Sequence, residues 1–335
     1  MRQGGARAVG ESRFEEGGVR AVVTGATGFV GRHLTEALLE RGWHITAAVR
    51  RPQRLGALAD ALTVVRWDAT EPVPEALRQA IHKANCLFHV AGLIKTPDAA
   101  QFYRVNTAAT VKLYDACRGS KCRFLFVSSQ AAAGPAFRPV PLSESAIPRP
   151  RCHYGLSKLK AESYIRSSAH TPFVIARPSL VFGPGDAETA QLVRVVRLGF
   201  IPAVPAHLRL LSVIYVYDLV NALVLLATHP DAVGKVFFVA HPQPVSMVRF
   251  LKEMAQVLGR SARRINLPCS FMELAAYGGD VLARLTKTTP SINSHKLPHI
   301  LARWWLCSPK RLMRLGWRPR FSLKNALAHW LAPSG

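Results

Sequence analysis

The sequence predicts an α/β fold, a doubly wound parallel sheet followed by a smaller, mostly helical C-terminal lobe. Short apolar runs such as "RAVVTGA", "HITAAVR" and "RFLFVSS" alternate with helical stretches through the first half of the chain. This alternation is typical of βαβ units, whose parallel strands are covered by helices on both faces. Past about residue 185 prolines become frequent and we expect helices such as 246–259 and 270–286, which predicts the separate lobe.

The expected elements follow one another in a regular order. "RAVVTGA" ends in glycine and leads to an amphipathic helix at about 29–41, and "HITAAVR" leads to a helical stretch through "LGALADAL". The later strands are "TVVRWDA", "CLFHVAG", "RFLFVSS" and "FVIARPS". The longest apolar stretch, 210–227, is interrupted by Asp218 and Asn221. We therefore expect a buried strand that leads to a helix there, and not a membrane span.

The composition is that of a globular protein with an unusually basic charge. Of the 335 residues, 49% are hydrophobic and 19% are charged, which suits a large core and argues against bulk disorder. The formal net charge is +24, and residues 241–335 alone contain 15 Lys and Arg against 3 acidic residues. Such a field favours anionic ligands, anionic membrane surfaces or nucleic acid, unless it is only a solvated basic face.

The cysteines and histidines predict neither a disulfide framework nor a metal site. The six cysteines form no CxxC motif, and the twelve histidines show no HExxH or other ligand spacing. Unpaired cysteines of this kind are typical of reduced thiols in a cytoplasmic protein.

A glycine-rich loop follows the first expected strand. "VVTGATGFVGRHL" places Gly25, Gly28 and Gly31 between that strand and a helix, where glycines permit a tight turn and close approach of a pyrophosphate. The helix N-terminus then offers free N–H groups to the phosphates. We therefore expect a Rossmann-type NAD(P)-binding domain over 19–185, with a further strand and helix from about 210–240. A disordered tail over 1–18 would precede it, and 186–335 would form mainly a substrate-binding lobe.

Tyr154 and Lys158 lie four residues apart on an expected helix. Proton transfer at a carbinol oxygen near neutral pH is difficult for tyrosine, whose ordinary pKa is about 10, unless a nearby cation stabilises the phenolate. A lysine at the fourth following position shares the helix face and could lower the pKa of the tyrosine. The pair also occurs by chance in many chains, so its meaning depends on the motifs upstream.

Several motifs in order resemble one enzyme family. The TGxxGxxG loop, Asp68, "HVAG", Asn106, Ser129, the YxxxK pair and "ARPSLVFGPGD" resemble the extended short-chain dehydrogenase/reductases, and the resemblance runs from about Val19 to Trp330. That group contains NAD-dependent epimerases and dehydratases, 3β-hydroxysteroid dehydrogenases and dihydroflavonol reductases. The resemblance implies an active enzyme, with Tyr154 as acid/base, Lys158 as its pKa modulator, Ser129 as the donor to the substrate oxygen and Asn106 in a proton relay. For Asn106 a helix N-cap is the alternative, and Ser128 is the structural neighbour most easily confused with Ser129.

The resemblance also implies the residues that bind the cofactor. Arg50 and Arg51 stand where an NAD enzyme would place an acidic residue, and guanidinium groups suit the 2′-phosphate, so NADP(H) is favoured over NAD(H). The remaining cofactor positions are Gly25, Thr27, Gly28, Phe29, Val30, Gly31, Asp68, Ala69, Val90, Ala91, Gly92, Tyr154, Lys158 and Pro178.

The expected substrate is largely apolar. Sugar-nucleotide enzymes of the family often carry an arginine where this chain has Leu211, although Arg209 could substitute. The candidate lining residues are mostly uncharged, with Lys95 as the exception: Leu93, Ile94, Ala131, Ala132, Ser179, Leu180, Phe200 and Ile201. We therefore expect a sterol-like or polycyclic alcohol or ketone.

Two further functions and several partners stay open. One alternative is a sugar-nucleotide epimerase or dehydratase, and another is a non-enzymatic binder of RNA or membrane surfaces. Trp304, Trp305 and Trp317, interleaved with arginines, suit a peripheral membrane contact through the basic C-terminal third, but core tryptophans are the favoured interpretation, and nucleic acid is not favoured. The family resemblance also implies a homodimer through the helices that carry Asn106 and Tyr154.

Overall fold

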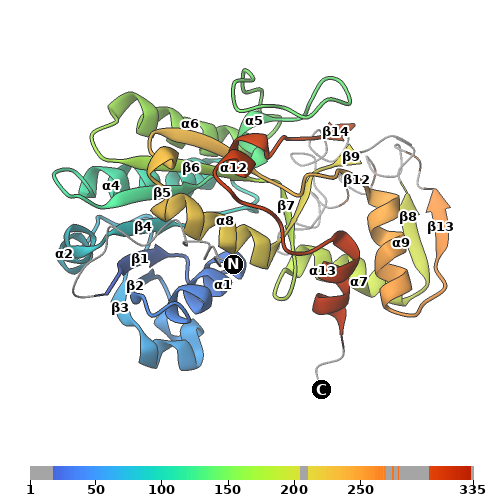
Figure 1. Ribbon diagram of the computed structural model, residues 1–335, viewed down its shortest axis with the longest axis horizontal. Helices are drawn as coiled ribbons and strands as arrows, with labels where there is room; N and C mark the ends of the chain where they lie inside the picture. The colour runs from blue at the N-terminus through green and yellow to red at the C-terminus, as the bar shows by residue number, and fades with distance from the viewer. Residues whose placement is uncertain are drawn as a thin grey trace, which may run out of the picture.

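A seven-stranded parallel sheet lies at the centre of the protein. The computed structural model describes residues 18–203, 210–266, 268, 274, 278 and 302–332. The strand order is β11-β6-β5-β4-β1-β2-β3, so the order along the chain reverses beside β1 (Figure 1). The strands are β1 (Arg20–Thr24), β2 (His44–Val49), β3 (Thr63–Arg66), β4 (Cys86–His89), β5 (Arg123–Val127), β6 (Phe173–Pro178) and β11 (Lys235–Val239). The predicted fold class is confirmed, and the reversal beside β1 is where such sheets bind ligands.

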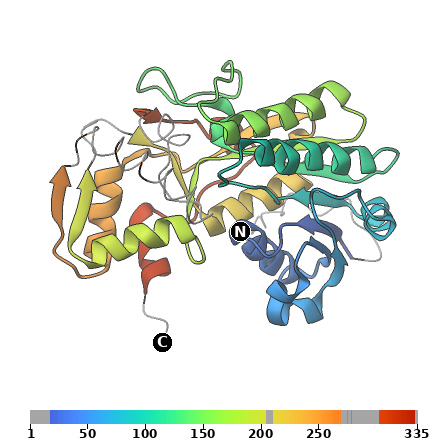
Figure 2. The same cartoon turned by 180° about the vertical axis from the view of Figure 1, so that it is seen from behind.

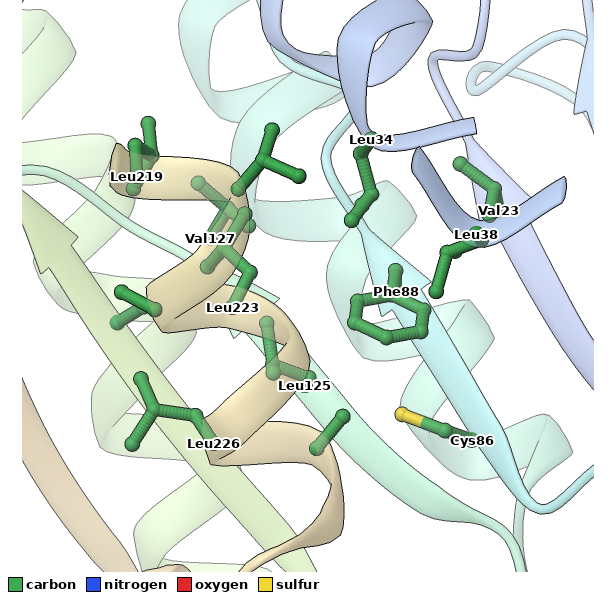
Figure 3. Packing of buried hydrophobic residues seen from close by; sticks show 14 of the residues in the cluster. Val23, Leu34, Leu38, Cys86, Phe88, Leu125, Val127, Leu219, Leu223 and Leu226 are labelled. Atoms are coloured by element: carbon green, nitrogen blue, oxygen red, sulfur yellow. The ribbon is translucent and has the colours of Figure 1, made fainter. Parts of the chain in front are cut away.

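Helices cover both faces of this sheet (Figures 1 and 2). On one face lie α1 (Phe29–Leu39) and α8 (Val216–Thr228); on the other lie α2 (Glu75–Lys83), α4 (Ala109–Ala116) and α6 (His153–Ser168). Figure 3 shows Leu223 and Leu226 of α8 close to Leu125 of β5, while Leu34 and Leu38 of α1 approach Phe88 of β4. All six side chains are fully buried, and truncating one of the leucines to alanine typically costs about 2–5 kcal/mol. This packing holds the strand ends that carry the site.

Several short helical elements lie between the strands of the main sheet along the chain. They are η1 (Pro52–Ala61), α3 (Ala99–Phe102), η2 (Tyr103–Ala108), α5 (Gln130–Ala133) and η3 (Pro230–Ala232). The turn η2 is π-helical and continues directly into α4, and α5 begins just after β5. The helical stretch predicted through "LGALADAL" is the 3₁₀ segment η1.

The smaller lobe combines helices with short sheets. Its elements are β7 (Leu180–Phe182), α7 (Ala187–Arg197), β8 (Phe200–Ala203), β9 (Leu210–Leu211), β10 (Val213–Tyr215), β12 (Val245–Ser246), α9 (Met247–Val257), β13 (Arg263–Asn266), β14 (Trp304–Trp305) and α13 (Leu323–Leu331). The short helix α12 (Lys310–Arg314) lies between β14 and α13 in the chain but packs against β11 of the main sheet. The predicted helix at 246–259 is α9. Of the helix predicted at 270–286 only Leu274 and Gly278 are described, and of the tail predicted over 1–18 only Gly18 is described. The stretch 210–227 forms β9, β10 and most of α8, as predicted.

Asp218 joins the end of the chain to the main sheet. It lies in the first turn of α8, and its carboxylate accepts hydrogen bonds from the backbone N–H of Arg320 at 2.7 Å and of Phe321 at 3.3 Å. Trp317 donates from Nε1 to the Asp218 carbonyl at 3.3 Å, and both Trp317 and Trp305 are buried. These two tryptophans are therefore core residues. Within the described residues, no helix has the length and apolar character needed to cross a membrane.

Candidate active site

The glycine loop between β1 and α1 forms a cradle that larger residues would fill. Gly25 has φ of 77°, in the left-handed region that favours glycine, and the N–H of Gly28 donates to the Gly25 carbonyl at 2.9 Å. A Cβ on Gly31 would lie 2.0 Å from that same carbonyl oxygen. The turn therefore closes tightly onto the start of α1, and its residues fit the pyrophosphate of a dinucleotide.

Charged residues follow the next two strands of the sheet. Arg50 and Arg51 come directly after β2, and the Arg50 side chain is 63% exposed, with Nε 3.9 Å from Asp68 Oδ2. Asp68 accepts hydrogen bonds from Thr70 through the backbone N–H at 2.9 Å and through Oγ1 at 2.8 Å. The backbone hydrogen bond from Thr70 is the main cause that lowers the pKa of Asp68. Both arginine side chains are therefore exposed and accessible to an anionic group.

The segment 90–92 crosses in front of the glycine loop. A Cβ on Gly25 would lie 2.8 Å from Ala91 Cα, and the N–H of Ala91 donates to Thr24 Oγ1 at 3.2 Å. Gly92 is exposed, and a Cβ there would lie 3.0 Å from Lys158 Nζ. The segment therefore links the expected phosphate cradle to the Tyr154–Lys158 helix.

Ser129 and Tyr154 lie together at the ends of α5 and α6. Gly155 permits this approach, because a Cβ there would lie 2.2 Å from the Ala131 carbonyl of α5. Ser129 accepts a hydrogen bond from the N–H of Ala131 at 3.1 Å and caps α5, and it also hydrogen-bonds the Tyr154 phenol. Ser128, in contrast, turns away and hydrogen-bonds Glu162. The structure thus brings Ser129, and not Ser128, to Tyr154.

The pKa of Tyr154 lies above the ordinary value of tyrosine. Burial raises the pKa of Tyr154 to about 12, and this outweighs the lowering effect of the Ser129 hydrogen bond. Lys158 Nζ donates to the Val127 carbonyl at 3.0 Å, and the expected lowering of the Tyr154 pKa by Lys158 stays a prediction. Tyr154 is therefore a phenol at neutral pH, as an ordinary tyrosine also is.

Lys158 is buried beneath the sheet edge. Its Nζ lies 4.7 Å from the centre of the Phe126 ring, which gives the cation an aromatic face. Burial lowers the pKa of Lys158 to about 8, although the nearby Glu162 charge opposes this shift. Lys158 is thus mostly charged at neutral pH and loses its proton in the mildly alkaline range.

Asn106 joins three parts of the site. Its Oδ1 accepts from the N–H of Leu93 at 2.7 Å, and its Nδ2 donates to the Leu93 carbonyl at 2.9 Å and to Ser157 Oγ at 3.0 Å. Asn106 lies inside the π-helical turn η2, so the alternative that it caps a helix is wrong. Single π-helical turns occur frequently at functional sites, and this one fixes the segment after β4 to α6.

Sequence reasoning missed a buried ion pair between α6 and β6. Glu162 and Arg177 have side chains only 1% and 2% exposed, and Arg177 Nε donates to Glu162 Oε1 at 3.0 Å. Glu162 stands four residues after Lys158, which itself stands four after Tyr154, so one helix face carries all three. That spacing was the available signal.

His89 was also missed. Its ring nitrogens lie 2.8 Å from Thr24 Oγ1 and 2.9 Å from Thr110 Oγ1, so it connects β1 to α4 beneath the site. Burial lowers the pKa of His89 to about 3, and the Lys158 charge acts in the same direction. His89 is therefore neutral and serves as a fixed hydrogen-bonding group.

The expected substrate residues divide into two groups. Ile94 is 58% exposed and follows β4, whereas Ala131 and Ser179 are buried just after β5 and β6. Lys95, in the same segment as Ile94, is half-buried. Within the described part of the chain, Ser179 Oγ and Gln130 Nε2 are buried without a hydrogen-bond partner, which suits polar contacts to a ligand.

Two other predicted lining residues lie on a short strand of the smaller lobe. Phe200 and Ile201 belong to β8, at the far end of the smaller lobe (Figure 1), and Ile201 packs into that lobe's core. β8 pairs with β13 and not with the main sheet, and the expected place of these two residues in the lining stays a prediction. Leu211 is buried in the same core, and Arg209 lies outside the described residues.

Comparison with known proteins agrees with this geometry. Residues 21–240, well over half of the chain, match the family described as "NAD dependent epimerase/dehydratase family". The chain is 29% identical over 317 residues to a ceramide reductase of Caulobacter vibrioides, covering 93% of this chain and 94% of the relative. It is also 29% identical over 289 residues to a UDP-glucose 4-epimerase of Vibrio cholerae, covering 82% and 87%. A crystal structure of UDP-glucose 4-epimerase with UDP-glucose from Thermotoga maritima shares the fold, with a TM-score of 0.73, 18% identity and coverage of 93% and 97%.

Proposed function

The chain belongs to the NAD dependent epimerase/dehydratase family and is an NAD(P)-dependent enzyme of the extended short-chain dehydrogenase/reductase type, and from this premise we propose that it reduces a ketone to a secondary alcohol with NADPH. The observation that carries the proposal is the position of Tyr154, hydrogen-bonded to Ser129 beside the buried, uncharged residues of α5. This arrangement suits an apolar carbonyl substrate, either sterol-like or polycyclic.

Tyr154 supplies the proton in this reaction. The nicotinamide of the bound cofactor supplies the hydride. An alkoxide is far more basic than a phenolate, so transfer from the Tyr154 hydroxyl to the substrate oxygen is favourable even with a tyrosine pKa of about 12. Ser129 positions that oxygen by a hydrogen bond, and Lys158 holds a positive charge beneath the site while the phenolate forms. The hydrogen bonds of Asn106 hold Leu93 in a fixed position relative to α6 during the reaction.

Arg50 and Arg51 support NADPH as the reductant. Both follow β2, where the adenosine ribose of the cofactor is held in this type of fold, and Arg50 is largely exposed. A guanidinium can donate two charge-assisted hydrogen bonds to the 2′-phosphate of NADPH. On NADH it could hydrogen-bond only to the neutral ribose hydroxyls. We expect R50Q to raise the KM for NADPH with little effect on that for NADH. R78Q, which neutralises an exposed arginine on α2, is the matched control.

Three observations support an apolar substrate. The buried residues Ala131, Ala132 and Ala133 follow the catalytic serine, and exposed Ile94 follows the neighbouring strand. Leu211, where sugar-nucleotide enzymes of the family often carry an arginine, is buried in the lobe core and cannot clamp a diphosphate. The similarity to a ceramide reductase over nearly the whole chain points in the same direction.

The second candidate is a sugar-nucleotide epimerase. Equal identity to the Vibrio cholerae epimerase favours it, and such a reaction would return the cofactor to its starting state in every turnover. A screen of ketones and UDP-sugars that follows NADPH and NADH absorbance separates the two functions. We expect NADPH oxidation with apolar ketones, and redox-neutral conversion of a UDP-sugar would overturn the proposal. The same family assignment disfavours the non-enzymatic binder.

A further inference from the structure

The loop between α5 and α6, residues 134–152, carries exposed apolar side chains. Phe137 is 55% exposed, Val140 is 63% exposed and Ile147 is 77% exposed. In Figures 1 and 2 this loop projects from the molecule above α5, beyond the rest of the chain on that side. Single exposed apolar residues are ordinary, but three in one projecting loop indicate a contact surface.

The loop is held in place, so its exposed side chains do not result from loose packing. Ala136 N–H donates to the Trp304 carbonyl at 2.8 Å, and Leu142 N–H donates to the Leu306 carbonyl at 3.1 Å. At the far end, Arg149 N–H donates to the Ala133 carbonyl at 2.8 Å. Five prolines, at 135, 139, 141, 148 and 150, further restrict its backbone. The apolar side chains are thus presented on a prearranged support.

The exposed charge of the loop is entirely positive. Arg138, Arg149 and Arg151 are exposed, and the Arg149 guanidinium lies 4.9 Å from the centre of the Phe137 ring. Glu144, the one acidic residue in the sequence 134–152, has a side chain only 5% exposed. It accepts a hydrogen bond from the N–H of Phe238 at 3.0 Å and therefore points inward. The loop offers apolar side chains and cations on one surface.

We propose that the α5–α6 loop docks on an anionic phospholipid bilayer, with Phe137, Val140 and Ile147 entering the headgroup region and the arginines meeting lipid phosphates. Exposed apolar groups beside arginines match the two contributions to peripheral membrane binding, buried apolar area and attraction to anionic lipid. The sequence predicts such a contact for the basic C-terminal third, which stays a prediction, whereas the present proposal concerns the α5–α6 loop.

Docking here would place the catalytic edge beside the bilayer. The loop begins at the end of α5, which follows Ser129, and ends at Cys152, two residues before Tyr154. Exposed Ile94 and Leu180 follow β4 and β6, the strands on either side of β5. An apolar ketone could then pass from the lipid to Tyr154 without crossing water. Only this delivery step rests on the proposed function; the docking itself does not.

Flotation with phosphatidylcholine vesicles, with and without phosphatidylglycerol, tests the docking. We expect the wild-type protein to float with the anionic vesicles. R138Q/R151Q should bind about 25-fold more weakly, because each arginine near an anionic surface strengthens binding roughly five-fold. F137S/V140S/I147S keeps the net charge and should lose most of the binding. R260Q/R263Q, which neutralises two exposed arginines near and on β13, is the charge-matched control and should bind like wild type.

Equal loss in R260Q/R263Q would overturn the proposal, because it would show attraction by overall charge. Unchanged vesicle binding by the triple serine variant would also overturn the proposal. If that variant also lost self-association, the loop would be a protein contact and not a membrane contact. Thermal unfolding and NADPH oxidation with a water-soluble ketone show that each variant is folded. Vesicle binding without any ketone reduction would leave the docking in place and refute only the proposed function.

Discussion

Neutralising Glu162 tests whether the buried ion pair supports the catalytic helix. In E162Q the Arg177 charge stays buried, with its side chain 2% exposed, and loses its counter-charge. Removing one partner of a buried pair typically costs about 3–5 kcal/mol, because the remaining charge is uncompensated. The matched control is E36Q, which breaks the surface pair with Arg32, whose side chains are 40% and 45% exposed. That pair should contribute less than about 1 kcal/mol.

Urea unfolding of both variants measures the two costs. E162Q/R177M removes both charges and should recover most of the loss in E162Q, since no buried charge is left unpaired. E162Q should also lower the pKa of Lys158 further below about 8, because the Glu162 charge now raises it. The rate of any step that needs charged Lys158 would then begin to decrease with rising pH at a lower pH than in the wild-type protein. The reasoning is refuted if E162Q is no more destabilising than E36Q.

Three further predictions concern the glycine loop, the serines and Lys158. G31A should lose most cofactor affinity and destabilise the fold by about 1–3 kcal/mol, because its Cβ would clash with the Gly25 carbonyl. G28A should reduce cofactor affinity and stability only slightly, because its Cβ would lie 3.3 Å from the same oxygen. Cofactor titration of the two variants measures the difference in affinity. S129A should lower kcat by about 10²–10³-fold while S128A retains most activity, and equal kcat losses would contradict the assignment. The Lys158 amine is less basic folded than unfolded, so it binds fewer protons in the native state between pH about 8 and 10.5 and stability should rise with pH there. K158M should abolish that rise, on the order of 3 kcal/mol, in urea unfolding at several pH values.

The fold could be predicted because its signals are local. Alternating apolar runs and helical stretches depend on neighbouring residues, and the glycine loop between β1 and α1 needs only its own backbone geometry. The spacing of Tyr154 and Lys158 on one helix face is equally local. Ser129 required the order of the strands, because the end of β5 meets the start of α6 only after the sheet has formed.

The electrostatics of the site could not be predicted in the same way. The sign of the Tyr154 pKa shift depends on burial by distant segments, and the Val127 carbonyl that holds Lys158 lies 31 residues away in the chain. The partnership of Glu162 with Arg177 likewise exists only in the folded core. The pairing of Phe200 and Ile201 with β13 was equally unpredictable, because an apolar strand in the smaller lobe has the same sequence pattern whichever strand it pairs with.

The most direct test of the central claim is the stoichiometry of NADPH oxidation with an apolar ketone by the wild-type protein and by Y154F. We predict one NADPH oxidised for each secondary alcohol formed by the wild-type protein. Y154F should lose about 10²–10⁴-fold in kcat while retaining NADPH affinity, because only the proton donor is removed. Ketone reduction that survives in Y154F at the wild-type rate would contradict the account.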